Sequence, residues 1–323
     1  MTSETAPHSN PRDAAARSPR RASRAPGAHW LPATVLAAFA ACVASSTPLG
    51  AQTNSEEQRR WNHPVEPFRI AGNVYYVGAH EVAAYLVATP DGHVILDSGF
   101  EETVPQILAN VETLGFRPAD VRLLLTSHAH FDHVGGMATL RERTGARLLM
   151  SAADAELAAR GGQGDPNFGD DFAYRPFRPD REIADGEVVE LGDSRLVAHL
   201  TPGHTRGCTT WTLRVEEHGR PLDVVFLCSV TAPGYRLVDN AGHPDIVADY
   251  RATFRRLAEL PVDVFLANHG SFFDLHGKRV ALGAKPAANP FVDPEGWRRH
   301  LERQREGFEA RLAAQRTEPR PRS

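Results

Sequence analysis

The sequence lacks several features that define other classes of protein. Its 323 residues carry 36 lysines and arginines against 40 aspartates and glutamates, a formal net charge of −4. No basic stripe or patch is present, and such a patch is the electrostatic footprint of a nucleic-acid-binding protein. No apolar run approaches the roughly 20 residues that a membrane-spanning helix needs. The helical zinc motif with two histidines four residues apart is also absent, so that class of metalloprotease is not supported.

The first 51 residues predict a secretory signal peptide. Five arginines lie in the polar stretch 1–29, an apolar run follows at 31–43, and small residues fill 44–51. This order is typical of export to the periplasm, and we expect cleavage near Ala51. Two alternatives stay open: a membrane anchor, disfavoured by Pro32 and the short run, and a lipid tether on Cys42, whose preceding residues match a lipoprotein box poorly. Cleavage leaves 31 basic and 38 acidic residues, so the expected partners are small molecules.

Cysteine is scarce, with three in the whole sequence. Only Cys208 and Cys228 remain after the predicted cleavage, and each lies at one end of an alternating apolar run. In an oxidising compartment they can form a cross-strand disulfide. Two buried free thiols are the alternative, because a sequence does not give the separation of two Cα atoms.

Three histidines and an aspartate are concentrated within six residues, His128-Ala129-His130-Phe131-Asp132-His133. They directly follow the apolar, strand-like stretch 121–125. Imidazole nitrogen and carboxylate oxygen are ligands that zinc prefers, and four donors on one short turn cannot all face a single tetrahedral ion. The sequence therefore predicts a metal-binding loop with two ions side by side.

The periodicity predicts an α+β fold in one domain. Each half contributes strands and then helices, so we expect two facing sheets with helices outside, a four-layer αββα sandwich with two pseudo-symmetric halves. The expected parts are an N-terminal extension at 52–65, the domain at 66–315 and a disordered tail at 316–323. We expect strands at 68–77, 82–88, 93–96, 121–125, 147–150, 188–191, 195–200 and 262–267, a hairpin over 208–227, and helices at 104–114, 134–143, 151–159, 246–260 and 294–315.

The segment 161–181 is rich in glycine, aspartate, proline and aromatic residues, has no periodicity, and is long for a plain connection. It is either a mobile flap over the site or a surface loop in which Phe168, Phe172 and Tyr174 pack as a small separate cluster. Two further histidines, His204 and His269, come directly after predicted strands and lie beside glycine. We expect both to reach the same rim as the metal loop.

These segments resemble the metallo-β-lactamase superfamily over about residues 66–285. In that family Asp97 lies behind the ligands and fixes the metal loop, as ligand-orienting partners do elsewhere. The resemblance rests on five motifs in order, which are Leu96-Asp97-Ser98-Gly99, the His128-x-His130-x-Asp132-His133 loop, Gly203-His204-Thr205, the segment from Cys228 to Tyr235, and His269.

Within the superfamily, the chain looks like the third subclass of class B β-lactamases. Thioesterases of the glyoxalase II type, lactonases and phosphodiesterases usually carry a bridging aspartate where this chain has Cys228-Ser229. The first subclass uses a cysteine at its second zinc but lacks a histidine at the position of His133. The resemblance implies two zinc ions per chain, one bound by His128, His130 and His204 and the other by Asp132, His133 and His269.

The segment 229–235 resembles the substrate-binding segment of that subclass. The resemblance implies that Ser229 and Thr231 receive the carboxylate of the antibiotic and that Tyr235 assists the carbonyl oxygen. For each, the alternative is a loop residue bonded to its own backbone. The implied activity is that of an exported, monomeric β-lactamase acting on penicillins, cephalosporins and carbapenems, in which a zinc-bound hydroxide oriented by Asp132 attacks the lactam. Another hydrolase of the superfamily and a non-catalytic metal-binding protein are the alternatives.

Overall fold

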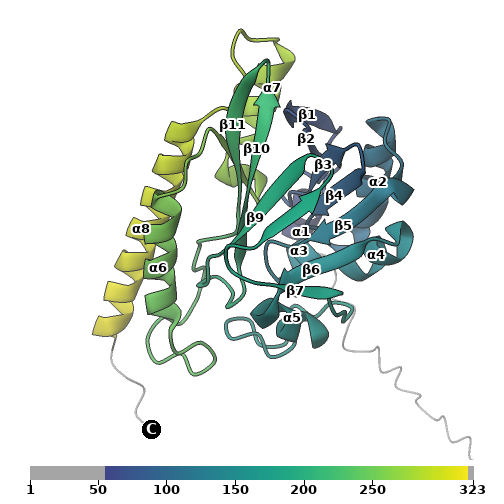
Figure 1. Ribbon diagram of the computed structural model, residues 1–323. Coiled ribbons are helices and arrows are strands. Elements are labelled where there is room, and N and C mark those ends of the chain that lie inside the picture. The colour runs from purple at the N-terminus through teal and green to yellow at the C-terminus, as the bar shows by residue number, and fades with distance from the viewer. Residues whose placement is uncertain (1–54, 319–323) are drawn as a thin grey trace, which may run out of the picture. The chain divides into compact units, whose positions relative to one another are not determined.

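Two β-sheets face each other between two layers of helices in the computed structural model, which describes residues 55–318 (Figure 1). The first sheet has seven strands in the order β1-β2-β3-β4-β5-β6-β7, and the second has five in the order β12-β11-β10-β9-β8. Each half of the chain therefore builds one sheet. The predicted α+β, four-layer αββα sandwich is confirmed.

Strands β3 to β6 form the buried centre of the first sheet. All five residues of β4 are buried, as expected for a strand that is covered on both faces. Strands β1 to β4 pair antiparallel and β4 to β7 pair parallel. The strands are β1 (Phe68–Ala71), β2 (Val74–Tyr76), β3 (Tyr85–Thr89), β4 (Gly92–Leu96), β5 (Val121–Leu125), β6 (Arg147–Ser151) and β7 (Arg181–Ile183).

Helices α2, α4 and α5 cover the outer face of this sheet, and their buried residues share one apolar cluster with it. In α2, Val104, Ile107, Leu108 and Val111 follow the spacing of one helix face, which explains why this segment packs there. The helices of this half are α1 (Glu56–Trp61), α2 (Val104–Thr113), α3 (Phe131–Val134), α4 (Met137–Thr144) and α5 (Ala152–Ala159), with short 3₁₀ turns at Glu101–Thr103 and Pro118–Asp120.

The second sheet is centred on a long hairpin whose turn contains His218 and Gly219. Both have positive φ, 51° and 75°, which suits the tight turn of a two-residue hairpin. The strands are β8 (Val188–Leu191), β9 (Ser194–Leu200), β10 (Thr209–Glu217), β11 (Arg220–Leu227) and β12 (Val264–Ala267). The helices are α6 (Ile246–Ala258), α7 (Leu275–Gly283) and α8 (Pro294–Thr317), with a 3₁₀ turn at Gly270–Phe272.

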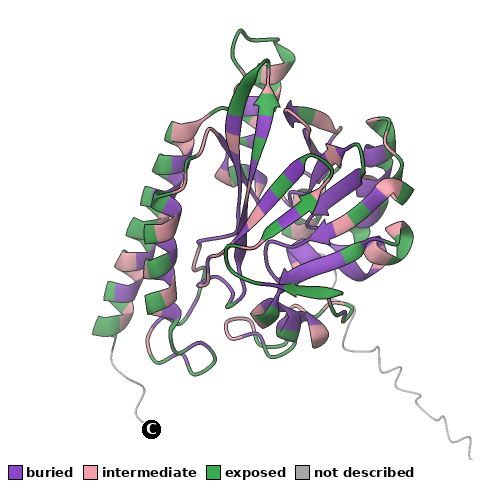
Figure 2. Ribbon diagram, in the orientation of Figure 1, coloured by how far each residue is buried: buried purple, intermediate pink, exposed green. Residues whose placement is uncertain are grey.

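Helices α6 and α8 lie side by side. Their buried residues are on the faces that pack against the rest of the domain, and their exposed residues are on the opposite faces (Figure 2). The rings of Tyr250 and Phe308 lie 4.8 Å apart between the two helices, and Arg251 forms an ion pair with Glu309 across the same contact. The inner faces of both sheets join the apolar faces of these two helices in one core. No helix within residues 55–318 is long and apolar enough to span a membrane.

Two predicted elements are each split by glycine. The strand expected at 68–77 is two strands, because Gly72 turns the chain with a φ of 51°, and a Cβ there would lie 2.6 Å from Val215 Cβ. The helix expected at 134–143 is the end of α3 followed by α4. Between them Gly136 lies against Phe100, whose carbonyl oxygen would be 2.6 Å from an added Cβ.

Other corrections concern short elements and the ends. The expected N-terminal extension contains helix α1, and β7 and α7 were not predicted. The expected tail at 316–323 is wrong at its start, because α8 continues to Thr317. The predicted signal peptide, Cys42 and residues 319–323 lie outside the described residues.

Candidate metal centre

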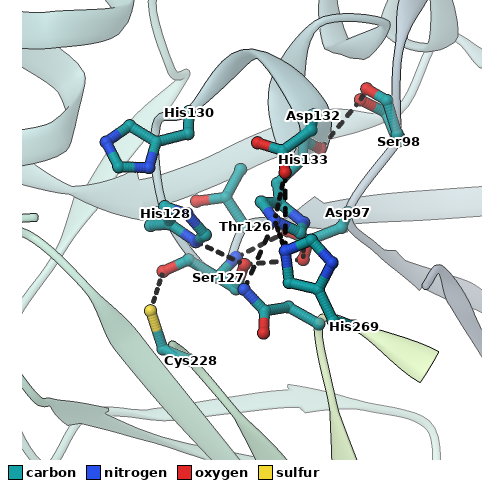
Figure 3. A network of polar contacts seen from close by, with 12 residues as sticks. Asp97, Ser98, Thr126, Ser127, His128, His130, Asp132, His133, Cys228 and His269 are labelled. Atoms are coloured by element: carbon teal, nitrogen blue, oxygen red, sulfur yellow. Dashed lines mark hydrogen bonds and ion pairs between the residues drawn. The ribbon is translucent and has the colours of Figure 1, made fainter. Parts of the chain in front are cut away.

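The metal loop begins at the carboxyl end of β5 and is fixed from behind by Asp97. The two carboxylate oxygens of Asp97 accept hydrogen bonds from the backbone N–H and the hydroxyl of Ser127, both at 2.6 Å (Figure 3). Burial raises the pKa of Asp97 to about 7, although the bonds from Ser127 oppose this shift. These contacts attach the start of the metal loop to the residue that follows β4.

The first predicted ligand group consists of His128, His130 and His204. The loop supplies two of them and the segment after β9 the third, and all three are buried. Their ligand atoms lie within 4.8 Å of one another, and His130 Nδ1 is 3.1 Å from His204 Nε2. Burial, together with the neighbouring imidazoles, lowers the pKa of both His128 and His204 well below the usual value, so both rings are neutral at pH 7.

The second predicted ligand group consists of Asp132, His133 and His269, at the start of α3 and after β12 (Figure 3). His133 Nε2 lies 3.2 Å from both His269 Nε2 and Asp132 Oδ2, and His269 Nε2 lies 3.4 Å from the same oxygen. Burial would raise the pKa of Asp132, but the imidazoles of His133 and His269 outweigh it and lower the pKa. His269 is also held between the rings of Trp61 and Phe272, so helix α1 contacts the site.

Both groups fit zinc by chemistry and by spacing. A tetrahedral ion with bonds of about 2.0 to 2.1 Å separates its ligand atoms by about 3.3 Å. The separations within the second group are 3.2 to 3.4 Å, and His130 and His204 of the first group are 3.1 Å apart. His128 Nε2 is buried without a hydrogen-bond partner. His128 also lies within ligand reach of Asp132 and His133, so it stands between the two groups.

The nitrogens that face away from the groups are held by oxygen atoms. His204 Nδ1 is 2.8 Å from the carbonyl oxygen of Thr231, and His128 Nδ1 is 3.1 Å from the hydroxyl of Ser127. A hydrogen bond at the outer nitrogen fixes the tautomer and leaves the inner nitrogen free to bind a metal.

Asp154, which the sequence analysis missed, ties the metal loop to the loop that carries His204. Its carboxylate accepts hydrogen bonds from the N–H groups of Ala129 and Gly207, both at 2.9 Å, and from the hydroxyl of Thr205 at 3.0 Å. Burial raises its pKa to about 6. No local pattern marks this residue, because its partners come from two distant segments.

Cys208 and Cys228 form a disulfide with a Cα–Cα separation of 5.9 Å, in the pairing that the sequence suggested. Both residues are fully buried. The Cys228 sulfur lies 3.3 Å from the carbonyl oxygen of Ser127, directly beneath the metal loop (Figure 3). These sulfurs are therefore part of the support of the loop and are not ligands.

The predicted substrate segment follows the disulfide. Ser229 is buried and Thr231 is partly exposed, and their hydroxyls lie 2.9 Å apart. Tyr235 lies behind His204, with 1% of its surface exposed and its hydroxyl 3.3 Å from His204 Nδ1. This position places Tyr235 on the outer side of the ligand, so its geometry favours support of His204 over contact with a substrate carbonyl.

The segment 161–181 packs against the metal loop. Phe168 contacts the ring of His130 at 5.0 Å, Phe172 stacks on Phe131 at 4.4 Å, and the Tyr174 hydroxyl donates to the carbonyl of Ala129. Phe168, Phe172 and Tyr174 therefore cover the outer side of the metal loop and do not form a cluster separate from it, which was one of the two alternatives for this segment.

Comparison with known proteins places this fold and site in a family. The sequence profile of the metallo-beta-lactamase superfamily matches residues 77–269. The chain belongs to the metallo-beta-lactamase superfamily, as the sequence motifs indicated.

The chain is similar to solved β-lactamases over almost the full length of those enzymes. The chain is 42% identical to the FEZ-1 metallo-beta-lactamase from Legionella gormanii, with a TM-score of 0.78 over 80% of this chain and 99% of that one. It is 36% identical to BJP-1, a subclass B3 enzyme of Bradyrhizobium japonicum, with a TM-score of 0.75 over 80% and 97%. The acyl-coenzyme A thioesterase MBLAC2 of Gallus gallus is 26% identical over 62% of this chain and 76% of the relative.

Proposed function

We propose that this protein is an exported β-lactamase that binds two zinc ions and hydrolyses the β-lactam amide of penicillins, cephalosporins and carbapenems. The observation that carries the proposal is the similarity to a solved β-lactamase at 42% identity across 99% of its length. The thioesterase relative is matched at 26% identity over a smaller share. Export rests on the sequence of residues 1–51 alone.

The proposed ligands would have different protonation states when they bind the metal. Bound zinc supplies a Lewis acid and lowers the pKa of water from 15.7 to about 7. Asp132 is ionised at neutral pH, because the imidazoles of His133 and His269 lower its pKa, and is therefore a ligand without losing a proton first. His128 and His204 are neutral, because burial disfavours the charged imidazolium and lowers the pKa of both rings.

Ser229 and Thr231 are proposed to receive the carboxylate of the drug. Changing both to alanine removes two hydrogen bonds to a charged group. Each bond is worth about 1.5 to 3 kcal/mol, so the loss of each should lower the affinity at least about tenfold. The effect should appear as a higher KM with little change in kcat, because the contact exists equally in the ground and transition states. Thr231→Ser keeps the hydroxyl and is the matched control. An unaltered KM in the double variant would assign the pair a structural role.

The second candidate is thioester hydrolysis, favoured by the similarity to the acyl-coenzyme A thioesterase. Purified protein assayed with nitrocefin, with imipenem and with an acyl-coenzyme A separates the two. We expect turnover of both β-lactams, complete loss with a chelator, and recovery on adding zinc. Turnover of the thioester alone would replace the β-lactamase proposal, and full activity of metal-free protein would refute the metal centre.

A further inference from the structure

Two carboxylates that belong to neither ligand group contact a ligand histidine from outside. Glu81 Oε1 lies 3.5 Å from His269 Nδ1, and Asp165 Oδ2 lies 3.3 Å from His130 Nε2. In both histidines the other ring nitrogen faces its ligand group. Each group thus contains one histidine that is held between a carboxylate and another residue of its own group.

Glu81 is fixed in place by the loop that carries His269. Its carboxylate accepts hydrogen bonds from the hydroxyl of Ser271 at 2.5 Å and from the Ser271 N–H at 3.2 Å. Its carbonyl oxygen accepts from the N–H of Gly270 at 2.8 Å, and the next residue, Val82, forms a backbone bridge with His269. The carboxylate therefore has little freedom to leave the imidazole.

Asp165 is fixed by its own loop. Its Oδ1 accepts hydrogen bonds from the backbone N–H groups of Asn167 at 2.7 Å and Phe168 at 2.8 Å, which leaves Oδ2 for His130. Gly169 pairs with the backbone of Asp165 in both directions, closing the turn. Asp165 is also buried, with 8% of its surface exposed, so the contact is shielded from water.

In the other three ligand histidines, no carboxylate among residues 55–318 lies within hydrogen-bond distance of the ring nitrogen that faces away from the group. His204 faces a neutral carbonyl, His128 faces a hydroxyl, and His133 Nδ1 is 3.8 Å from Asp97, beyond hydrogen-bond distance. A carboxylate at the outer nitrogen holds the proton there, keeps the inner nitrogen unprotonated and makes it more basic. The effect of each acid should therefore be confined to its own group.

We propose that Glu81 and Asp165 are positioning residues, one for each metal: Glu81 sets the zinc affinity of the Asp132, His133, His269 group through His269, and Asp165 sets that of the His128, His130, His204 group through His130. The inference rests on the two-zinc centre of the proposed function and is independent of the β-lactam substrate.

The test measures zinc affinity in two backgrounds that each leave one group intact. Asp132→Ala keeps the first group, and His204→Ala keeps the second. Glu81→Gln and Asp165→Asn, which keep shape and remove charge, are then added to each background, and zinc is titrated into metal-free protein against a chromophoric chelator. We expect Glu81→Gln to weaken zinc binding about 10- to 100-fold in the His204→Ala background only, and Asp165→Asn to do so in the Asp132→Ala background only.

Each variant is the control for the other. Urea unfolding of the metal-free variants provides the second readout, and we expect it to match the parent proteins. Equal weakening of both groups by either variant, or a loss of metal-free stability that parallels the loss of affinity, would assign these acids a structural role and overturn the inference. Unchanged affinity in both backgrounds would also overturn it. Parent protein that binds no zinc would instead refute the metal centre of the proposed function, and this inference with it.

Discussion

Breaking the Cys208–Cys228 disulfide should lower the stability of the protein by an amount that can be worked out. The bond joins residues 20 positions apart, at the two ends of the β10–β11 hairpin. In the chain-entropy picture, a crosslink that closes a loop of this length removes about 11 cal/mol/K from the unfolded chain, or about 3 kcal/mol at 25 °C. For a domain of this size that corresponds to a fall in Tm of about 6 to 12 °C.

The assay is urea or thermal unfolding of metal-free protein, because zinc binds only the folded state and would hide the loss. Cys42→Ala is present in every variant, so that the two bonded cysteines are the only ones. Each single change, Cys208→Ala or Cys228→Ala, breaks the same bond as the double change. The two singles and the double should therefore cost nearly the same free energy, which is strong non-additivity.

The reasoning would be refuted by single effects that simply add up in the double variant, because that pattern reports two independent packing losses and no crosslink. A double variant within about 0.5 kcal/mol of the parent would also refute it, since surface changes without a mechanism stay in that range.

Two further predictions concern the backbone before His204 and a buried histidine. Gly203 has a φ of 143°, and an added Cβ would lie 2.8 Å from the ring of Tyr250, so Gly203→Ala should lower stability by more than about 1 kcal/mol and weaken zinc binding by the first group. Gly219→Ala, at a φ of 75° with open space around it, is the control for strain alone, and equal losses in zinc affinity would contradict the argument. Burial, helped by Arg303, lowers the pKa of His300 from 6.5 to about 4, so its stabilising contribution is complete above pH 6.5 and is lost as the pH falls toward 4. Relative to His300→Phe, the parent should lose about 3 kcal/mol between pH 7.5 and 4 in urea titrations, and parallel curves would refute this.

The fold brings the six predicted ligands together, and each of them has a local signal in the sequence. Four donors lie within six residues of one loop, and His204 and His269 each follow an apolar strand and lie beside glycine. Glu81 and Asp165 had no such signal. Glu81 meets Ser271 across 190 positions, and Asp165 meets His130 across 35, so only the folded chain brings these partners together.

The elements that were missed are short or weakly apolar. Helix α1 has no buried residue, and its one sequence signal is the capping box in which Ser55 and Gln58 bond to each other's backbone. Helix α7 buries only Leu275 and Lys278, so it has no apolar stripe to detect. The helix expected at 134–143 was displaced because the turn after His133 needs close backbone approach to Phe100, which outweighs helical periodicity.

The two ligand groups have the same construction, and this bears on how metal binding and folding are coupled. Each draws two ligands from the loop after β5 in the first sheet and one from the second half of the chain, His204 after β9 or His269 after β12. Each zinc ion would thus join the two sheets at the edge where those strands end. A ligand bound only by the folded state adds about 4 kcal/mol of stability at a free concentration 1,000 times its dissociation constant. Metal binding would therefore stabilise the contact between the two sheets at the edge where the buried imidazoles lie.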